Sequence, residues 1–481
     1  MIADLKPYPA MKDSGVPWLR EMPEHWEVQR NGRRFAQRNE TGFADLPILE
    51  VSLRTGVRIR NFENPDRKQV MSDRDKYKRA AAGDIAYNMM RMWQGAVGVA
   101  PTDGLISPAY VVAKPLPGTE SRYFLRLFRT AAYMTEVDKY SRGIVKDRNR
   151  LYWEDFKRMP VLVPPLPEQA AIVCFLDHVD RRIRRYIRAK QKLIKLLEEQ
   201  KQAIIHSAVT SGLDPNVRLK PSGVEWLGDV PEHWQVQRLK SIVRRIDQGV
   251  SPQAENYRAE GGAWGVLKAG CVNRGVFRQS EHKRLPASFE FDPNLAVAEG
   301  DVLVSRASGS PHLVGSVGRV PPLEYKVILS DKTFRPVFIQ DVDPDFMVLA
   351  MNGRYYRNQV EQAISGAEGL ANNLPLSSLR AFFFVLPPAQ EQRKIIEHMR
   401  RSMKELQATV THAEREIELL REYRIRLIAD LVTGKLDVRE AAARLPKEAE
   451  EPESLDGADT LTDAEEDTPD DLDADPEEAE A

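Results

Sequence analysis

A long internal repeat constrains this chain more than any other feature of its sequence. Residues 14–30, SGVPWLREMPEHWEVQR, recur at residues 222–238 as SGVEWLGDVPEHWQVQR, with 12 identities in 17 positions and an offset of 208. A match of this length is not expected by chance. The 481-residue chain therefore predicts two copies of one structural unit, at about 1–212 and 213–440, followed by a tail.

A second repeated motif extends the duplication through the rest of the chain. VPPLPEQ at residues 163–169 recurs as LPPAQEQ at residues 386–392, at an offset of 223. Between the two motifs the offset rises, and it is 217 at the Gly-Asp pairs 83–84 and 300–301. The second copy therefore carries small insertions on the same frame, which predicts one shared fold with two different specificities.

Each copy consists of a globular part and a long helical part. Residues of about 24–162 and 232–385 mix short β-rich runs with Gly and Pro, which predicts an α+β domain. The predicted strands include Ile48–Leu53, Ala109–Val112, Val302–Ser305 and Phe382–Leu386, and the predicted helices include Ser121–Tyr133.

The second part of each copy has the apolar spacing of a coiled coil, with steps that alternate between four and three residues. The apolar positions are Ile172, Leu176, Val179, Ile183, Tyr186, Leu193, Leu197 and Ile204 in the first helix, and Ile395, Met399, Leu406, Val410, Ala413, Ile417, Leu420 and Leu427 in the second. Two such helices most simply pack against each other as a spacer between the globular domains. The alternative that each helix packs on its own domain stays open.

The net charge of -1 is the sum of two unlike regions. Residues 448–481 contain 17 acidic residues and no Lys or Arg, so residues 1–447 carry a net charge of +16. A basic body is typical of a protein that binds a polyanion. The tail has no aromatic residue and few Leu, Ile or Val, so we expect it to be disordered.

The chain has no recognisable catalytic motif, which favours a non-enzymatic role. It lacks a phosphate-binding Gly-x4-Gly-Lys-Ser/Thr loop, an HExxH zinc motif and a Gly-x-Ser-x-Gly nucleophile motif. His25 and His233 lie in the repeated Pro-Glu-His-Trp, where we expect a structural role. Two Cys, no signal peptide and no long apolar run predict a cytoplasmic protein without metal or cofactor of its own.

Two pairs of polar loops are candidates for contacts with DNA bases, because Arg reads guanine and Asn reads adenine through paired hydrogen bonds. The candidates are Asn88, Arg91, Trp93, Lys146, Arg148 and Asn149 in the first copy, and Ser305, Arg306, Ser308, Asn372 and Asn373 in the second. For each single residue, a solvated loop or a helix cap remains the alternative.

A run of cations in the first long helix is a further candidate. Residues 181–195 contain eight Arg and Lys and no acidic residue. The exposed flank of a coiled coil normally alternates its charges, so this run favours a contact with phosphates or with an acidic partner.

In this order, the motifs resemble those of the specificity subunits of type I restriction-modification systems. The resemblance rests on the repeated Pro-Glu-His-Trp, the Gly-Asp-hydrophobic elements, the two Pro-Pro-x-x-Glu-Gln motifs, the long helices and the endings Val209–Asp214 and Val432–Asp437. It covers about residues 14–440, which is nearly all of the chain except the acidic tail.

The resemblance implies two target recognition domains held apart by an antiparallel helical pair, with a pseudo-twofold axis. The implied boundaries are 1–162 and 213–385 for the domains, 163–212 and 386–440 for the spacer helices, and 441–481 for the acidic tail. Each domain would read one half of an asymmetric, bipartite site in double-stranded DNA, and the helices would set the gap.

The resemblance also implies the partners and leaves two alternatives. Two methyltransferase subunits would use S-adenosylmethionine to methylate adenine, and restriction subunits would use ATP and Mg²⁺ to translocate and cleave DNA. The first alternative is the recognition half of an enzyme whose catalytic activity resides in this chain. The second is a coiled-coil scaffold that binds only proteins.

Overall fold

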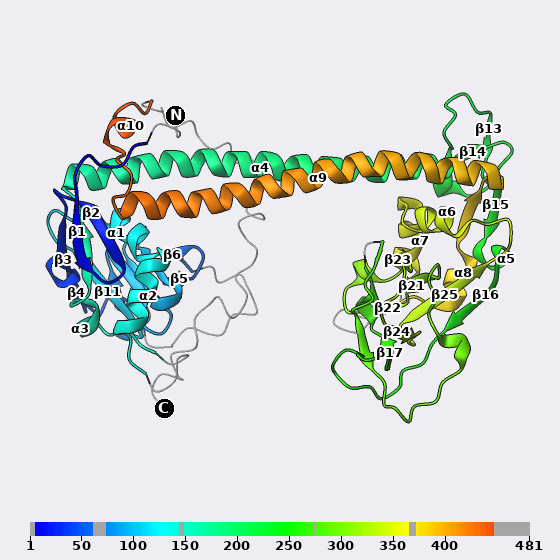
Figure 1. The fold of residues 1–481 in the computed structure, drawn as a ribbon, viewed down its shortest axis with the longest axis horizontal. Coiled ribbons are helices and arrows are strands. Elements are labelled where there is room, and N and C mark those ends of the chain that lie inside the picture. Colours follow the sequence, from blue (N-terminus) through cyan, green and yellow to red (C-terminus); the bar gives the residue numbers. More distant parts are fainter. Residues whose placement is uncertain (1–4, 61–73, 144–148, 274, 365–371, 447–481) are drawn as a thin grey trace. The chain divides into compact units, whose positions relative to one another are not determined.

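The computed structural model describes residues 5–60, 74–143, 149–273, 275–364 and 372–446. They form two compact units (Figure 1). Unit 1 combines Met1–Ala189 with Glu416–Ala481, and unit 2 is Lys190–Arg415. No helix in these described ranges is long and apolar enough to cross a membrane.

Both units are mixtures of short strands and helices, as predicted. Unit 1 contains β1 (Met11–Val16), β2 (Leu19–Pro23), β3 (Glu27–Arg30), β4 (Phe35–Arg38), β5 (Leu49–Ser52), β6 (Gly56–Ile59), β7 (Lys78–Ala80), β8 (Ile85–Asn88), β9 (Val97–Val99), β10 (Gly104–Ile106), β11 (Tyr110–Pro115), α1 (Ser121–Phe128), α2 (Ala131–Tyr140), α3 (Trp153–Phe156), β12 (Pro160–Val163) and α10 (Arg439–Ala443). Unit 2 contains β13 (Leu219–Pro221), β14 (Asp229–Pro231), β15 (Gln235–Arg238), α5 (Leu239–Ile242), β16 (Val243–Gln248), β17 (Trp264–Leu267), β18 (Val272–Asn273), β19 (Val276–Phe277), β20 (His282–Arg284), β21 (Val302–Ser305), β22 (Ala307–Ser308), β23 (Val317–Arg319), β24 (Lys326–Ile328), β25 (Thr333–Phe338), α6 (Pro344–Ala350), α7 (Arg354–Ala363), β26 (Asn372–Asn373), α8 (Leu376–Ala381) and β27 (Phe383–Leu386).

The central sheets of the two units have the same topology. Unit 1 has the antiparallel order β4-β11-β8-β9, and unit 2 has the antiparallel order β16-β25-β21-β23. A second small sheet joins β3 to β12 in unit 1 and β15 to β27 in unit 2. The repeat in the sequence is therefore a repeat of the fold.

One helix predicted from the sequence is two helices in the structure. The predicted segment Ser121–Tyr133 divides into α1, which ends at Phe128, and α2, which starts at Ala131. Thr130 separates them, because its backbone is extended and its hydroxyl accepts a hydrogen bond from the Tyr133 N–H. An N-cap of this kind starts a new helix.

Two long helices, α4 (Leu166–Thr210) and α9 (Ala389–Val432), each contribute to both units. In unit 1 the first part of α4 packs against the last part of α9, where Arg424 donates a hydrogen bond to Asp180 at 2.9 Å. In unit 2 the last part of α4 and the first part of α9 share one core, which includes Ile205 and Ile395. The two helices therefore run antiparallel, as expected.

The predicted apolar seam of α4 holds at its start and fails near its middle. Four of the predicted positions are buried, namely Ile172, Leu176, Val179 and Ile183. Tyr186 is 54% exposed and Leu193 is 38% exposed, whereas Ile187 packs against the core of unit 1. A helix with 3.6 residues per turn drifts by about 20° per heptad from a strict seven-residue repeat, which moves the buried stripe to a neighbouring residue.

The repeated Pro-Glu-His-Trp motif holds the start of each long helix. Trp26 Nε1 donates to Glu168, in the first turn of α4, at 2.9 Å, and Trp234 Nε1 donates to Glu391, in the first turn of α9, at 2.6 Å. The histidine before each tryptophan lies 2.8 and 3.0 Å from the same carboxylate. The histidines are therefore structural, as predicted. Within each unit, the Pro-Glu-His-Trp motif binds the glutamate of the Pro-Pro-x-x-Glu-Gln motif.

The glutamine that follows each of these glutamates ties the long helix to a short one. The side-chain oxygen of Gln169 accepts the N–H of Glu120 at 2.9 Å, and that of Gln392 accepts the N–H of Asp343 at 2.8 Å. Glu120 and Asp343 are the N-cap residues of α1 and α6. Each Pro-Pro-x-x-Glu-Gln motif thus fixes the angle between a long helix and the domain beside it.

Glycines end both long helices against the same tryptophans. Gly434 has φ +75°, and a Cβ at this position would lie 2.3 Å from Pro23 and 3.1 Å from Trp26. Gly212 has φ +80°, and a Cβ there would lie 3.1 Å from Trp234. Only glycine combines the left-handed backbone with this close approach. Each tryptophan is therefore enclosed by the start of one long helix and the end of the other.

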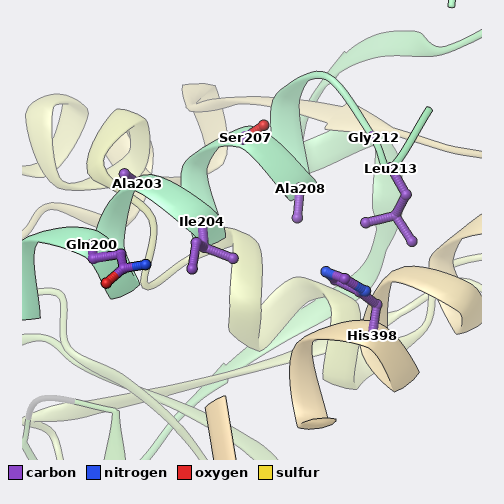
Figure 2. Close-up of a pocket in the computed structure, with 8 residues that line it drawn as sticks. All are labelled: Gln200, Ala203, Ile204, Ser207, Ala208, Gly212, Leu213 and His398. Atoms are coloured by element: carbon purple, nitrogen blue, oxygen red, sulfur yellow. The ribbon is translucent and has the colours of Figure 1, made fainter. Parts of the chain in front are cut away.

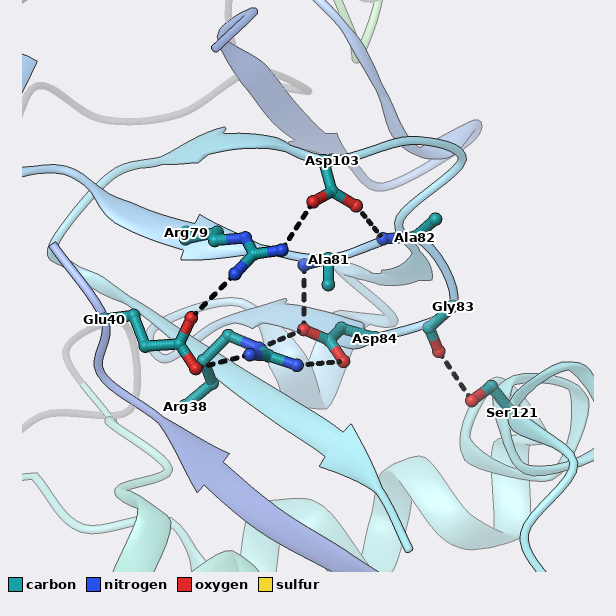
Figure 3. A network of polar contacts seen from close by, with 9 residues as sticks. All are labelled: Arg38, Glu40, Arg79, Ala81, Ala82, Gly83, Asp84, Asp103 and Ser121. Carbon is teal, nitrogen blue, oxygen red and sulfur yellow. Dashed lines mark hydrogen bonds and ion pairs between the residues drawn. The ribbon is translucent and has the colours of Figure 1, made fainter. Parts of the chain in front are cut away.

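The repeated Gly-Asp pairs form identical turns before the central strands β8 and β21. Asp84 and Asp301 each accept the backbone N–H three residues earlier, at 2.9 and 3.0 Å. In unit 1, Arg38 Nε also donates to Asp84 at 2.6 Å, and this bond raises the pKa of Arg38 (Figure 3). In unit 2 the arginine comes from a different strand, because Arg335 of β25 binds Asp301 at 3.0 Å.

Candidate nucleic-acid interface

The same backbone hydrogen bond brings two polar loops together in each unit. The Leu151 N–H donates to the Met89 carbonyl at 2.8 Å in unit 1, and the Leu374 N–H donates to the Arg306 carbonyl at 2.8 Å in unit 2. Leu151 and Leu374 correspond at the 223 offset, and Met89 and Arg306 at the 217 offset of the Gly-Asp turns. The candidates from separate parts of the sequence therefore meet at equivalent places. We call these places platform 1 (Asn88, Arg91, Asn149) and platform 2 (Arg306, Ser308, Asn372, Asn373).

Platform 2 is built on a two-residue β ladder. Ser308 of β22 pairs with Asn372 of β26, and Ala307 pairs with Asn373. The side chains of Ser308, Asn372 and Asn373 are all half-buried. Cross-strand partners share one face of a ladder, so Ser308 and Asn372 place a hydroxyl and an amide side by side, and these groups can donate to and accept from base edges.

Arg306 of platform 2 is held in place by two contacts. Its Nη1 donates to the Asp331 carbonyl at 2.9 Å, and its guanidinium lies 5.8 Å from the centre of the Phe334 ring. These contacts use one face and one donor of the guanidinium. The remaining donors of this half-buried side chain can reach a partner with little loss of rotamer entropy.

Platform 1 follows strand β8. Asn88 is only 3% exposed, and its side-chain oxygen accepts the Met90 N–H at 2.8 Å, so it shapes the turn. Arg91 is half-buried and precedes a short 3-10 helix, in which Trp93 Nε1 donates to the Met90 carbonyl at 2.9 Å. Asn149 is half-buried, and its amide lies 3.4 Å from Asp138.

Two of the predicted DNA contacts, Lys146 and Arg148, lie outside the described residues. The residues on either side are described, and Arg142 and Arg150 exchange two backbone hydrogen bonds at 3.0 and 2.9 Å. Arg142 is 68% exposed and bound to Asp155. Its place at the edge of platform 1 could have been inferred from the cation-rich sequence around it.

Lys332 is a platform neighbour that the sequence did not point to. Its carbonyl accepts the Arg306 N–H at 2.8 Å. Its side chain is 44% exposed, and the ammonium group lies 3.0 Å from Asp331. No repeated motif marks this lysine, so its position beside platform 2 depends on the pairing of β21 with β25.

The part of the chain that is described offers two further observations. No group of three or more His, Cys, Asp and Glu side chains in it is placed to hold a metal ion. A groove of about 500 Å³ lies in unit 2 where α4 ends and α9 begins (Figure 2). It is lined by Gln200, Ala203, Ile204, Ser207, Ala208, Gly212, Leu213 and His398. It contains no platform residue and is separate from the candidate interface.

Comparison with known proteins finds several relatives of one kind, although no family model matches the chain. The EcoEI specificity subunit of a type I restriction enzyme from Escherichia coli is 30% identical over 208 residues, which are 43% of this chain and 34% of that protein. The EcoKI specificity subunit from Escherichia coli K12 is 22% identical over 58% of both chains. The chain thus spans about a third and somewhat more than half of these two relatives.

A third relative and a solved structure match over most of the chain. The putative MjaX specificity subunit from Methanocaldococcus jannaschii is 22% identical over 87% of this chain and 95% of its own length. A chain in a structure of a type I restriction-modification system, described for its assembly and conformational transition, has a TM-score of 0.63 and 16% identity. The match covers 86% of this chain and 99% of that one, and shows the shared fold. The chain thus shares the fold of that solved structure, and the relatives that match it are named specificity subunits of type I restriction enzymes.

Proposed function

We propose that this chain is the sequence-specific DNA-recognition subunit of a type I restriction-modification complex. The observation that carries the proposal is the pair of equivalent platforms, each assembled by the same backbone bond from two loops whose residue types differ. Equivalent placement with different side chains is what two readers of different half-sites require. The named relatives lend no support to an enzyme in this chain or to a scaffold that binds only proteins.

The charge distribution supports duplex DNA as the ligand. Residues 1–447 have a net charge of +16. Contacts with phosphates give most of the affinity of such proteins and position them on the duplex, whereas base contacts give specificity. We assign specificity to Arg91 and Asn149 of platform 1, to platform 2, and to Lys146 and Arg148. We assign to Asn88 only the positioning of the turn beside Arg91.

The domain boundaries of the proposal follow the repeat. The target recognition domains are placed at 1–162 and 213–385, the spacer helices at 163–212 and 386–440, and the acidic tail at 441–481. Two methyltransferase subunits would dock on this chain and supply S-adenosylmethionine-dependent adenine methylation. Restriction subunits would supply translocation and cleavage with ATP and Mg²⁺, so this chain would direct the chemistry and perform none of it.

Methylome sequencing tests the proposal. A host that expresses the chain together with a type I methyltransferase subunit from the same genome should acquire methylated adenine in one split, asymmetric motif. Expression of the methyltransferase alone is the control and should leave the motif unmethylated. The absence of any split motif in the complete system would contradict the proposal. Transfer of labelled methyl groups by the purified chain alone would favour the enzyme alternative.

A further inference from the structure

The first part of the cationic run of α4, residues 181–188, forms an exposed face in unit 1. Arg181, Arg184, Arg185 and Arg188 are exposed, whereas Ile183 is 4% exposed and belongs to the core. Residues spaced by three and four positions lie on one side of a helix, so these arginines point away from the buried stripe. We call this set the arginine face.

Two arginines at the centre of this face have no partner in the described ranges. Neither Arg184 nor Arg185 forms an ion pair or a hydrogen bond with a described residue. Elsewhere in unit 1 the helix contacts are made between opposite charges, as between Arg126 and Asp180 at 3.0 Å. Arg181 and Arg188, at the ends of the face, have interactions within the chain, whereas Arg184 and Arg185 are exposed charges that the described part of the body leaves unpaired.

The second long helix shows that the fold does not require this charge. At the 223 offset, residues 181–195 correspond to residues 404–418 of α9, which contain two Lys and Arg and four Glu. Both segments lie within a continuous α-helix. The eight cations of α4 are therefore a property of one copy, and a separate role accounts for them better than helix stability does.

We propose that the acidic tail, residues 448–481, docks on the arginine face of its own chain and screens it from nucleic acid. The tail has 17 carboxylates and no cation. The segment 181–195, which contains the arginine face, has no acidic residue. Charge complementarity of this kind gives attraction that is strong at low salt. A tail in this position competes with DNA phosphates, and that consequence rests on the proposed function.

The last described residues lie in the same unit as the arginine face. The guanidinium of Arg439, in α10, lies 5.2 Å from the centre of the Tyr8 ring, and the Tyr8 hydroxyl donates to Glu168 in the first turn of α4. Arg184 follows Glu168 by roughly 24 Å along the helix. A segment of more than thirty residues in extended conformation spans roughly 100 Å, so the tail is long enough to reach the face.

Photo-crosslinking in the intact chain tests the contact without DNA. Tyr186, 54% exposed and next to Arg185, is replaced by a photoreactive phenylalanine, and crosslinked peptides are identified by mass spectrometry. The matched control places the same group at Thr409, the exposed counterpart of Tyr186 in α9. We expect the yield of crosslinks to residues 448–481 to be about tenfold higher from position 186. It should fall to the control level at about 0.5 M salt.

Two further measurements complete the test. Arg184→Gln with Arg185→Gln should reduce the crosslink yield at position 186, whereas Arg393→Gln with Lys394→Gln, an exposed cation pair in α9, should not. A mixture of heavy- and light-isotope chains separates binding of the chain's own tail from binding of a second copy's tail. Equal yields at 186 and 409, or crosslinks only between copies, would overturn the proposal.

The effect on DNA is measured separately. A chain that ends at Lys447 should bind a nonspecific duplex about tenfold more tightly than the full chain at low salt. This difference should shrink when Arg184 and Arg185 are both Gln. If the crosslinks form but neither chain binds DNA, the docking stands and the proposed function fails. If both bind DNA equally, the screening role is wrong.

Discussion

The two units place a short helix on a long helix in the same way but with exchanged charges. In unit 1, Arg122 of α1 binds Asp177 of α4 at 2.6 Å. At the 223 offset in unit 2, Asp345 of α6 faces Arg400 of α9 at 4.0 Å. The position of the contact has been retained, while the side that carries the positive charge has not.

A neighbouring position differs more strongly between the units. In unit 1, Asp180 binds Arg126 at 3.0 Å and Arg424 at 2.9 Å, which joins α1, α4 and α9. Its counterpart in unit 2 is Met403, and the counterpart of Arg126 is Leu349, which both pack on the core of that unit. The same place between the short helix and the long helices is thus filled by an ionic cluster in unit 1 and by apolar side chains in unit 2.

What the two units share without exchange is the junction of tryptophan, glutamate, glutamine and glycine. These residues satisfy buried polar groups and a left-handed backbone, for which few other residue types are suitable. The comparison separates positions where geometry admits one solution from positions where it admits several. The platforms belong to the second kind, and the following predictions test this division.

The largest effect is expected at the two tryptophans. Trp26→Ala and Trp234→Ala should each reduce the free energy of unfolding of their own unit by about 4 kcal/mol, because both side chains are completely buried. Hydrogen exchange followed through increasing denaturant measures each unit separately. Trp226→Ala, at a side chain that is 42% exposed, is the control and should cost less than about 1 kcal/mol. A clear inequality between the two buried sites would break the equivalence of the junctions.

A smaller and unequal effect is expected at the glutamates. The Glu168 side chain is 5% exposed and that of Glu391 is 40% exposed. Glu168→Ala should therefore cost unit 1 about 3 kcal/mol, and Glu391→Ala should cost unit 2 about 1 kcal/mol, since water can satisfy Trp234 once the carboxylate is gone. The same exchange measurement compares them. Equal costs would show that burial does not control the strength of this contact.

The ionic cluster should make the stability of unit 1 depend on pH. Burial alone would raise the pKa of the Asp180 carboxyl, but Arg424 and Arg126 hold it below its usual value near 3.8. The contribution is therefore present above about pH 4 and is lost as the pH falls through the lowered pKa. Asp180→Asn should cost about 2 kcal/mol at pH 7, and the gap from the parent chain should close on acidification.

The matched control for this pH dependence is in unit 2. Met403→Leu retains the apolar contact and should shift stability by less than about 1.5 kcal/mol, equally at all pH values. Urea unfolding of the parent chain and both variants between pH 2 and pH 7 gives the comparison. A gap for Asp180→Asn that stays constant down to pH 2 would contradict the assigned cause.

The smallest effects are expected at the platforms and concern specificity. Asn372→Ala with Asn373→Ala should relax one half-site of the methylated motif by about 1–2 kcal/mol, and Arg91→Ala should relax the other. Methylome sequencing of each variant reports which bases change. Arg393→Ala, an exposed α9 cation outside both platforms, is the control and should leave both half-sites intact. A change in both half-sites from one variant would mean that the platforms do not act separately.

The sequence predicted the architecture because its strongest signals lie in the junction. Trp26 and Glu168 are 142 positions apart, yet both belong to repeated motifs, so the sequence marked them both and only their contact remained unknown. The heptad pattern predicted two long helices, although Tyr186 and Leu193 proved to be exposed, and their antiparallel direction was implied by the family resemblance. The domain boundaries and the individual DNA contacts remain predictions.

Other features could not be inferred because they depend on partners that no motif marks. Arg38 and Arg335 bind equivalent aspartates from different strands, so alignment of the two copies does not relate them. Arg122 and Asp345 are equivalent positions of opposite charge. That each pairs with the long helix beside it could not be inferred without the structure. The β ladder that joins Ser308 to Asn372 links loops that only the fold brings together.

The discontinuity of unit 1 has a consequence for how the chain folds as it is synthesised. The core of unit 1 includes Leu427, Leu431 and Val438, which are made only after all of Lys190–Arg415. At roughly 5–20 residues per second, the ribosome needs on the order of 10–50 seconds for that intervening segment. Unit 2 is contiguous and can complete its core within this interval. Unit 2 is therefore expected to complete its core before unit 1 does. Until the last residues are synthesised, the apolar side of α4 that includes Ile172 and Leu176 stays uncovered.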